Sequence, residues 1–247
     1  MSSDKKLEEQ FVAQVAEATI SQQLDSAKNV DVDIQSDLFK MLQGQADSVS
    51  FEGQGLVIKD IRVEDIKVQT DKVDINPLSA VFGQVELNKP VNAKVRVIMT
   101  EADINRALTS KYIRSKWIRF DLNVDGEIVG LIPQTIQIRF PDEGKIECVG
   151  KVTIERNNNK SDLGFIAVVR PRTQLQPIML ESFVCSEGEG ITFDITVAAI
   201  KKVEELVNSA YFELDDIALR IQEMAVHKGN MMLITQAYIR QIPSEIM

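Results

Sequence analysis

The stretch Val91–Asp103 reads VNAKVRVIMTEAD and carries the sharpest local signal in the chain. Apolar side chains occupy every second position from Val91 to Met99, which predicts a β-strand with one buried and one solvent-exposed face. Thr100 follows, with acidic residues at positions 101 and 103. A threonine hydroxyl can accept a hydrogen bond from a free amide at a helix N-terminus, where acidic side chains are also favoured. We therefore expect this strand to lead directly into a helix that ends near Ser110.

Upstream, residues 5–28 lack glycine and proline and are rich in good helix formers, which predicts a long N-terminal helix. Its apolar side chains form two stripes and leave one narrow polar wedge. The first stripe holds Leu7, Phe11, Val15 and Ala18, and the second holds Ala13, Ala16, Ile20, Leu24 and Ala27. A helix on a flat sheet needs an apolar arc of about 100°. The wider arc predicts that a curled sheet, a partner or a ligand covers this helix.

Most of the remaining chain alternates with a period of two, which is typical of half-buried strands. We expect strands at residues 30–34, from 49, from 120, and at 134–140, 145–155, 165–170, 178–185, 212–226 and 231–242. The alternating stretch 57–75 fits either two strands or one long bent strand. Asp125-Gly126 is a hairpin signal. A second amphipathic helix is expected near Asp194–Ser209. Because strands mostly follow strands, the class is α+β with an antiparallel sheet, in a single domain spanning residues 1–247.

Composition limits the possible functions. The chain has 247 residues, 44% hydrophobic and 26% charged, with 28 basic against 37 acidic residues and a net charge of −9. An acidic chain is a poor general ligand for nucleic acid. No uncharged segment approaches the roughly 20 apolar residues of a spanning helix, and the first residues lack the apolar core of a secretory signal. We expect a cytoplasmic protein, at most peripheral on the inner face of a membrane, with Cys148 and Cys185 as buried thiols.

Motifs of catalysis and cofactor binding are missing. The single histidine, His227, falls at a predicted hairpin tip and cannot build a catalytic triad or a multi-histidine zinc site. Gly53-Gln54-Gly55 lacks the third glycine of a dinucleotide fingerprint. The string Asp121–Gly126 resembles half of a calcium loop, but its twelfth position is Ile132 rather than an acid, so an Asp-Gly hairpin is favoured. We expect neither an enzyme nor a bound metal or cofactor.

One segment stands out by charge. Between Asp103 and Asp121 the chain contains no acid, and its basic side chains are Arg106, Lys111, Arg114, Lys116 and Arg119. Trp117, the only tryptophan, lies among them. Basic residues with an aromatic ring suit the surface of an anionic membrane, where each cation near the surface contributes about 1 kcal/mol. The alternative is a solvated helix end followed by an ordinary strand.

Apolar residues are more abundant than these elements require. Leu38, Phe39, Met41 and Leu42 fall on one short turn, and Leu78, Val81 and Phe82 on another, where they could close the end of a tube. They either complete an ordinary core or line a cavity that holds acyl chains, since each buried CH₂ contributes about 0.8 kcal/mol. The candidate lipid contacts are Leu7, Phe11, Val15, Ile20, Leu24, Phe39, Leu42, Leu78 and Phe82.

Several segments together resemble one family. They are Leu38–Gly44, Asn76–Leu78, Leu87–Pro90 and above all Val97–Leu108, which reads VIMTEADINRAL. Over residues 7–243 the chain resembles the LmeA-like phospholipid-binding family. The resemblance implies a TULIP-like fold, in which a long N-terminal helix is wrapped by a highly curved antiparallel β-sheet around a hydrophobic tunnel. It also implies non-catalytic binding or transfer of phospholipid, and the family offers no catalytic residues to carry over.

The sequence therefore favours a phospholipid-binding protein that docks transiently on an anionic membrane surface. Three other readings stay open. The chain could be a structural or adaptor module that binds a partner through its first helix, a carrier of another apolar molecule such as a quinone or pigment, or, least favoured, a hydrolase. The sequence leaves the lipid headgroup and the oligomeric state open.

Overall fold

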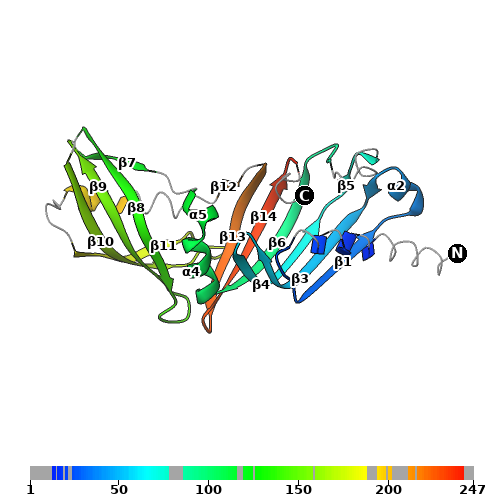
Figure 1. Cartoon of the computed structure of the whole chain (residues 1–247), viewed down its shortest axis with the longest axis horizontal. Helices are drawn as coiled ribbons and strands as arrows, with labels where there is room; N and C mark the ends of the chain where they lie inside the picture. The colour runs from blue at the N-terminus through cyan, green and yellow to red at the C-terminus, as the bar shows by residue number, and fades with distance from the viewer. Residues whose placement is uncertain are drawn as a thin grey trace. The chain divides into compact units, whose positions relative to one another are not determined.

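The computed structural model describes residues 13–14, 16–18, 20–21, 24–77, 86–115, 119–124, 126–157, 159–187, 194–198, 200–201, 211–214 and 216–241. This part of the chain is mostly antiparallel β-sheet with few helices (Figure 1), in agreement with the α+β class. It divides into two compact units. Unit 1 comprises residues 1–99, 211–222 and 232–247, and unit 2 comprises residues 100–210 and 223–231. The hairpin of the last two strands contributes residues to both units.

A seven-stranded sheet with the order β1-β3-β4-β6-β14-β13-β12 forms most of unit 1. Its strands are β1 (Asn29–Gln35), β3 (Ser48–Ile58), β4 (Ile61–Thr70), β6 (Val91–Thr100), β12 (Tyr211–Leu214), β13 (Ile217–His227) and β14 (Asn230–Ile239). A short helix, α2 (Leu38–Leu42), follows β1, and the short strands β2 (Gln45–Ala46) and β5 (Val73–Asp74) pair with each other. The strand predicted from Val91 is confirmed.

A tight turn divides the stretch that the alternation left as one bent strand or two. Lys59 and Asp60 have φ of 49° and 65°, the conformation that a two-residue type I′ hairpin requires. After this turn the apolar residues change phase between Val63 and Ile66, yet β4 keeps a continuous register with β3. The phase change therefore moves the apolar side chains from one face of the sheet to the other, because successive side chains of a strand alternate between faces.

The long N-terminal helix is seen only in part. Residues 13–14, 16–18 and 20–21 are helical, Ala13 is buried, and Glu17 Oε1 accepts a hydrogen bond of 3.0 Å from the Val32 amide of edge strand β1. The predicted end near Lys28 is wrong. The amide of Lys28 donates to the Gln54 carbonyl at 2.9 Å, and Ser26 bridges to Val57. These bonds to β3 hold residues 24–28 in a non-helical conformation.

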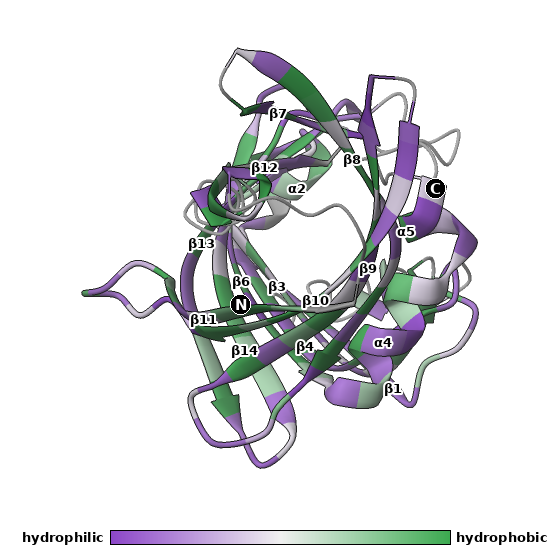
Figure 2. Ribbon diagram, turned by 90° about the vertical axis from the view of Figure 1, so that its left-hand side faces the viewer, coloured by the Kyte–Doolittle hydropathy of each residue, from purple (hydrophilic) through white to green (hydrophobic). Residues whose placement is uncertain are grey.

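Unit 2 contains a five-stranded antiparallel sheet with the order β11-β10-β9-β8-β7, which curls into a half-barrel (Figure 2). Its strands are β7 (Phe120–Val124), β8 (Glu127–Arg139), β9 (Ile146–Arg156), β10 (Asn159–Arg170) and β11 (Met179–Glu187). Leu122, Val129, Ile154 and Leu163 pack with Ile195 in a buried cluster. Ile195 belongs to the predicted second helix, of which residues 194–198 and 200–201 are described and helical. That helix therefore packs against the curled sheet.

Helix α4 (Glu101–Thr109) covers an open edge of this sheet. The Thr100 hydroxyl accepts from the Asp103 amide at 3.0 Å, which confirms the predicted N-cap. Strand β7 pairs only with the first part of β8, so the far end of β8, which pairs with β9 on one side, has no described strand on the other. There the Asn105 side chain donates to the Ile138 carbonyl and accepts from the Ile138 amide, both at 2.8 Å. Glu101 Oε2 accepts from the Phe140 amide at 2.8 Å. A second short helix, α5 (Lys111–Ser115), follows.

Two further expectations concern turns. The Asp125-Gly126 hairpin is confirmed, since β7 and β8 pair directly and the Gly126 amide donates to Asn123 Oδ1 at 2.9 Å. The continuous strand predicted over residues 212–226 is wrong, because the chain reverses direction and Leu214 of β12 pairs with Ile217 of β13.

Candidate functional site

An apolar face runs across four strands of unit 1. The register places Val32, Phe51, Val68 and Val95 opposite one another in a single row from β1 to β6. The next row on this face holds Val30, Gly53, Ile66 and Val97. Val32 is buried, but Phe51, Val68 and Val95 are only half-buried. The face is therefore a continuous apolar surface that the described residues do not fully cover.

The predicted lipid contacts are only partly placed by the structure. Ile20 and Leu24 are half-buried, and Leu24 lies beyond the helical residues. Phe39 and Leu42 lie on α2 with 77% and 72% of their surfaces exposed, so neither lines an interior. The remaining candidates, Leu7, Phe11, Val15, Leu78 and Phe82, lie outside the described residues.

Helix α2 carries two exposed apolar side chains, Phe39 and Leu42, on a short segment that a cap and an ion pair hold in place. The Asp37 side chain accepts from the Lys40 amide at 3.0 Å and caps the helix. The Lys40 ammonium lies 2.8 Å from Asp47, and this hydrogen bond raises the pKa of Lys40 above its ordinary value. The cap and the ion pair fix the short helix while Phe39 and Leu42 face solvent.

The predicted membrane-surface residues fall into two groups. Arg106 on α4 and Lys111 and Arg114 on α5 are exposed. Arg119 is also exposed, but it is engaged by two acids, with Asp121 and Glu155 each at 2.7 Å. The hydrogen bond to Asp121 is the main cause that raises the pKa of Arg119.

Lys116 and Trp117 lie outside the described residues. The described part of the basic segment thus contributes three exposed cations on two consecutive short helices. The charge of Arg119 is balanced by the carboxylates of Asp121 and Glu155.

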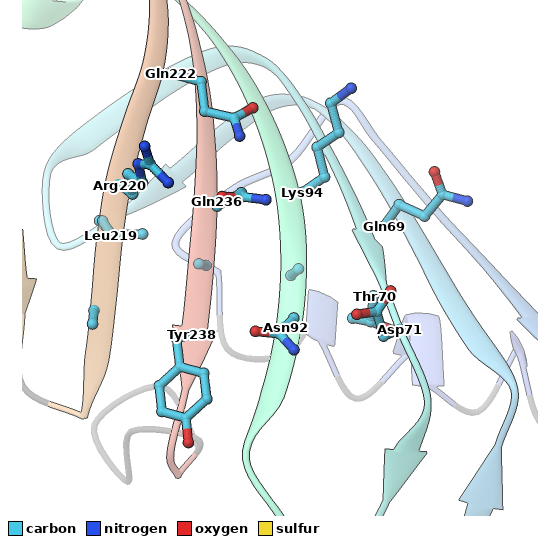
Figure 3. A pocket seen from close by; sticks show the side chains of 13 residues that line it. Gln69, Thr70, Asp71, Asn92, Lys94, Leu219, Arg220, Gln222, Gln236 and Tyr238 are labelled. Carbon is cyan, nitrogen blue, oxygen red and sulfur yellow. The ribbon is translucent and has the colours of Figure 1, made fainter. Parts of the chain in front are cut away.

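A polar groove on the same sheet was not anticipated from the sequence. It has a volume of about 960 Å³ and lies over β4, β6, β14 and β13 (Figure 3). Its polar lining includes Gln69, Asn92, Lys94, Arg220, Gln236 and Tyr238. Two of these residues, Asn92 and Lys94, occupy polar, solvent-facing positions of the strand that begins at Val91, so the sequence pattern could have indicated them. The groove also contains Arg220, Gln236 and Tyr238, which are more than a hundred positions further along the chain. They come together because of the strand order, which cannot be predicted from a local sequence pattern.

Among the residues that the structure describes are the single histidine and both cysteines. His227 is exposed at the tip of the β13–β14 hairpin, 3.0 Å from Glu143, which agrees with a surface turn. Cys148 and Cys185 are free and partly buried, and burial raises the pKa of the Cys148 thiol to about 11. No cluster of three or more His, Cys, Asp or Glu side chains suited to a metal ion occurs in these ranges.

The comparisons identify the family. Searches of the curated proteins and of the solved structures returned no match. Within the described ranges, none of the helices has the length and hydropathy needed to cross a bilayer. The model of one family, described as LmeA-like phospholipid-binding, matches residues 6–236, nearly the whole chain, and confirms the resemblance seen in Val97–Leu108. The chain belongs to the LmeA-like phospholipid-binding family.

Proposed function

We propose that this protein binds a phospholipid through the apolar face of unit 1 and carries it to or from a membrane without catalysing a reaction. The observation that carries the proposal is the row Val32, Phe51, Val68 and Val95, whose last three members are only half-buried in a chain of a phospholipid-binding family. Acyl chains laid on this face would be removed from water together with the half-buried side chains.

The energetics of such a site need no specialised motif. Each CH₂ group that leaves water contributes about 0.8 kcal/mol, so a long acyl chain gains affinity by apolar contact alone. The helical residues 13–14, 16–18 and 20–21 would form the opposite wall, with Ile20 toward the ligand, and the candidates Leu7, Phe11, Val15, Leu78 and Phe82 would extend it. Exposed Phe39 and Leu42 would contact the lipid where it enters.

Docking on an anionic membrane is the second part of the proposal. Arg106, Lys111 and Arg114 supply exposed positive charge, and Trp117 would lie at headgroup depth, as aromatic rings do at membrane interfaces. Lys116 would add to this surface. We infer a peripheral protein that meets the cytoplasmic face of a membrane.

Native mass spectrometry of the purified protein, followed by lipid extraction, tests the binding. We expect co-purified phospholipid in the unaltered chain and its loss in Val68→Asn and Val95→Asn, which place an amide on the apolar face. Val184→Asn is the matched control, because Val184 is exposed on β11 of unit 2. Far-ultraviolet circular dichroism verifies that each variant folds. An extract without phospholipid, or equal retention in all variants, refutes the site.

The same extract separates the other readings. A ligand that absorbs visible light would indicate a pigment or quinone carrier, and a stoichiometric protein partner in place of lipid would indicate an adaptor. For docking, sedimentation with anionic but not neutral vesicles is expected, weakened in Arg114→Glu and Trp117→Ala. Lys72→Glu, an exposed charge reversal in unit 1, should sediment like the unaltered protein.

A further inference from the structure

The polar groove lies on the face of the unit 1 sheet opposite the apolar rows. Gln69 pairs with Lys94, and the neighbouring residues Val68 and Val95 pair with each other. Since successive side chains of a strand point to opposite faces, the groove residues project away from the apolar face. The groove is therefore a separate site, and what it binds does not depend on the lipid site proposed above.

Carboxamides dominate the groove. Gln69, Asn92, Gln222 and Gln236 come from four neighbouring strands and gather over one hollow (Figure 3). Within the described residues, none of these four side-chain amides forms a hydrogen bond with a protein group. Each amide offers two donors and an acceptor, and neighbouring strands lie about 4.8 Å apart. The groove thus presents several hydrogen-bond donors and acceptors on neighbouring strands, which suits a ligand that carries several hydroxyl groups.

The charge of the groove is weakly positive. Lys94 and Arg220 contribute two cations and Asp71 one carboxylate, which leaves one net positive charge on a chain whose total is −9. Lys94 is exposed and has no ion pair with another described residue. An ammonium group that is not already paired favours an anionic oxygen such as a phosphate, to which it donates a charge-assisted hydrogen bond.

An aromatic ring completes one end of the groove. Tyr238 on β14 is 42% exposed and lies beside Asn92 in Figure 3. Its ring offers an apolar surface for the C–H groups of a ring-shaped ligand, and its hydroxyl can donate or accept a hydrogen bond.

Other occupants fit these features poorly. Strands β4, β6 and β14 have a neighbouring strand on both sides, so the middle of the groove offers no backbone edge to which a peptide could add a strand. A single carboxylate is too few for a hard metal ion, and two cations are too few for a nucleic acid. The polar lining also disfavours an acyl chain, because amides buried by a hydrocarbon would lose their hydrogen bonds to water.

We propose that this groove binds a phosphorylated polyol, with Lys94 on the phosphate and the amides of Gln69 and Gln236, on the two strands that flank β6, on hydroxyl groups. The volume of about 960 Å³ lies within the roughly 300–1,000 Å³ of small-molecule sites. The same chemistry occurs in a free sugar phosphate and in a polyol headgroup on a membrane.

Isothermal titration calorimetry with glucose 1-phosphate, glucose and inorganic phosphate tests the chemistry. Glucose 1-phosphate should bind at least about tenfold more tightly than either fragment, since hydroxyls and phosphate are both recognised. Lys94→Gln and Gln236→Ala should each weaken it about tenfold. Lys72→Gln and Gln54→Ala are matched controls, because Lys72 is exposed just outside the groove and Gln54 is exposed on β3 of the same sheet. Equal affinity for inorganic phosphate, or no binding, overturns the proposal.

Vesicles identify the source of the ligand. Phosphatidylglycerol and phosphatidylserine carry the same net charge, but only the former has a terminal diol. Preferential sedimentation with phosphatidylglycerol that is lost in Lys94→Gln assigns a membrane headgroup. Binding of glucose 1-phosphate without this preference assigns a soluble sugar phosphate. Retained lipid extraction in Lys94→Gln would show that the apolar site works independently, so failure of one site is distinguishable from failure of the other.

Discussion

Cys148 carries a thiol whose pKa burial raises from 9.0 to about 11. In the unfolded chain the thiol releases its proton near pH 9, whereas in the folded chain it keeps the proton until about pH 11. The folded state therefore binds more protons between these values, and the free energy of unfolding falls as the pH rises through this interval.

We expect urea denaturation between pH 8 and 11 to show a steeper loss of stability in the unaltered protein than in Cys148→Ala, which has no thiol to titrate. The difference between the two curves removes the contribution of lysines and tyrosines. Parallel curves would show that the Cys148 thiol titrates as it does in the unfolded chain.

Gly150 is a residue at which a single methyl group should disturb two strands. A Cβ atom at this position would lie 2.5 Å from two ring atoms of Phe165 and 3.2 Å from the Thr135 carbonyl oxygen. The Phe165 ring in turn stacks on Phe183 with centroids 5.6 Å apart, so it has little freedom to move. We predict that Gly150→Ala lowers the free energy of unfolding by about 1–3 kcal/mol, as overpacking does.

A double-mutant cycle in denaturant measures the cause. Phe165→Leu removes the ring edge, so Gly150→Ala should cost less in that background than in the unaltered protein. Additive energies would mean that the backbone rather than the ring resists the methyl group.

At the scale of elements, side-chain hydrogen bonds attach α4 to the side of β8 that no described strand covers. Asn105 bonds to both backbone groups of Ile138 at 2.8 Å. Asn105→Ala removes both bonds, and we expect it to destabilise the protein by about 1–3 kcal/mol. Arg106→Ala, an exposed change on the same helix, should cost much less. Equal effects in chemical denaturation would show that the amide does not secure the helix.

The elements predicted correctly are those whose signals are local. Thr100 caps α4 because the hydroxyl and the amide it serves are three residues apart. The first helix was predicted to extend to Lys28, but it ends earlier because backbone hydrogen bonds from Ser26 and Lys28 to β3 oppose helix formation. Helix propensity does not account for hydrogen-bond partners that are distant in the sequence. The alternation could not place the turn at Lys59-Asp60, because the pair lacks the glycine that marks a two-residue hairpin turn in a sequence.

The candidate sites show the same limit at the scale of the molecule. The apolar character of Val30–Ile34 and Val91–Met99 was visible in the sequence, but only the sheet order joins them into one face. The polar groove unites Gln69, Lys94 and Gln236, which are remote in sequence. The exposure of Phe39 and Leu42 also could not be predicted from periodicity. A short apolar helical turn has the same sequence pattern whether it is buried or exposed.

The charge of the whole molecule leads to a prediction about membrane docking. The net charge is −9, so an anionic vesicle repels the protein as a whole while the exposed cations Arg106, Lys111 and Arg114 attract it locally. The Debye length is about 30 Å at 0.01 M salt and about 8 Å at 0.15 M. At low salt, the acidic residues far from the docking surface therefore still repel the vesicle. Moderate salt screens this repulsion, whereas high salt also weakens the attraction of the nearby cations.

We accordingly expect sedimentation with anionic vesicles to pass through a maximum near physiological ionic strength, rather than to fall steadily from the lowest salt. Lys111→Glu combined with Arg114→Glu should remove the maximum, because the local attraction is then lost while the overall repulsion grows. Lys72→Glu combined with Lys89→Glu adds the same negative charge elsewhere and should lower the curve but keep its maximum. A steady decline from the lowest salt in the unaltered protein would show that local attraction outweighs the net charge at every distance, and the same maximum in both double variants would place the docking surface outside the basic segment.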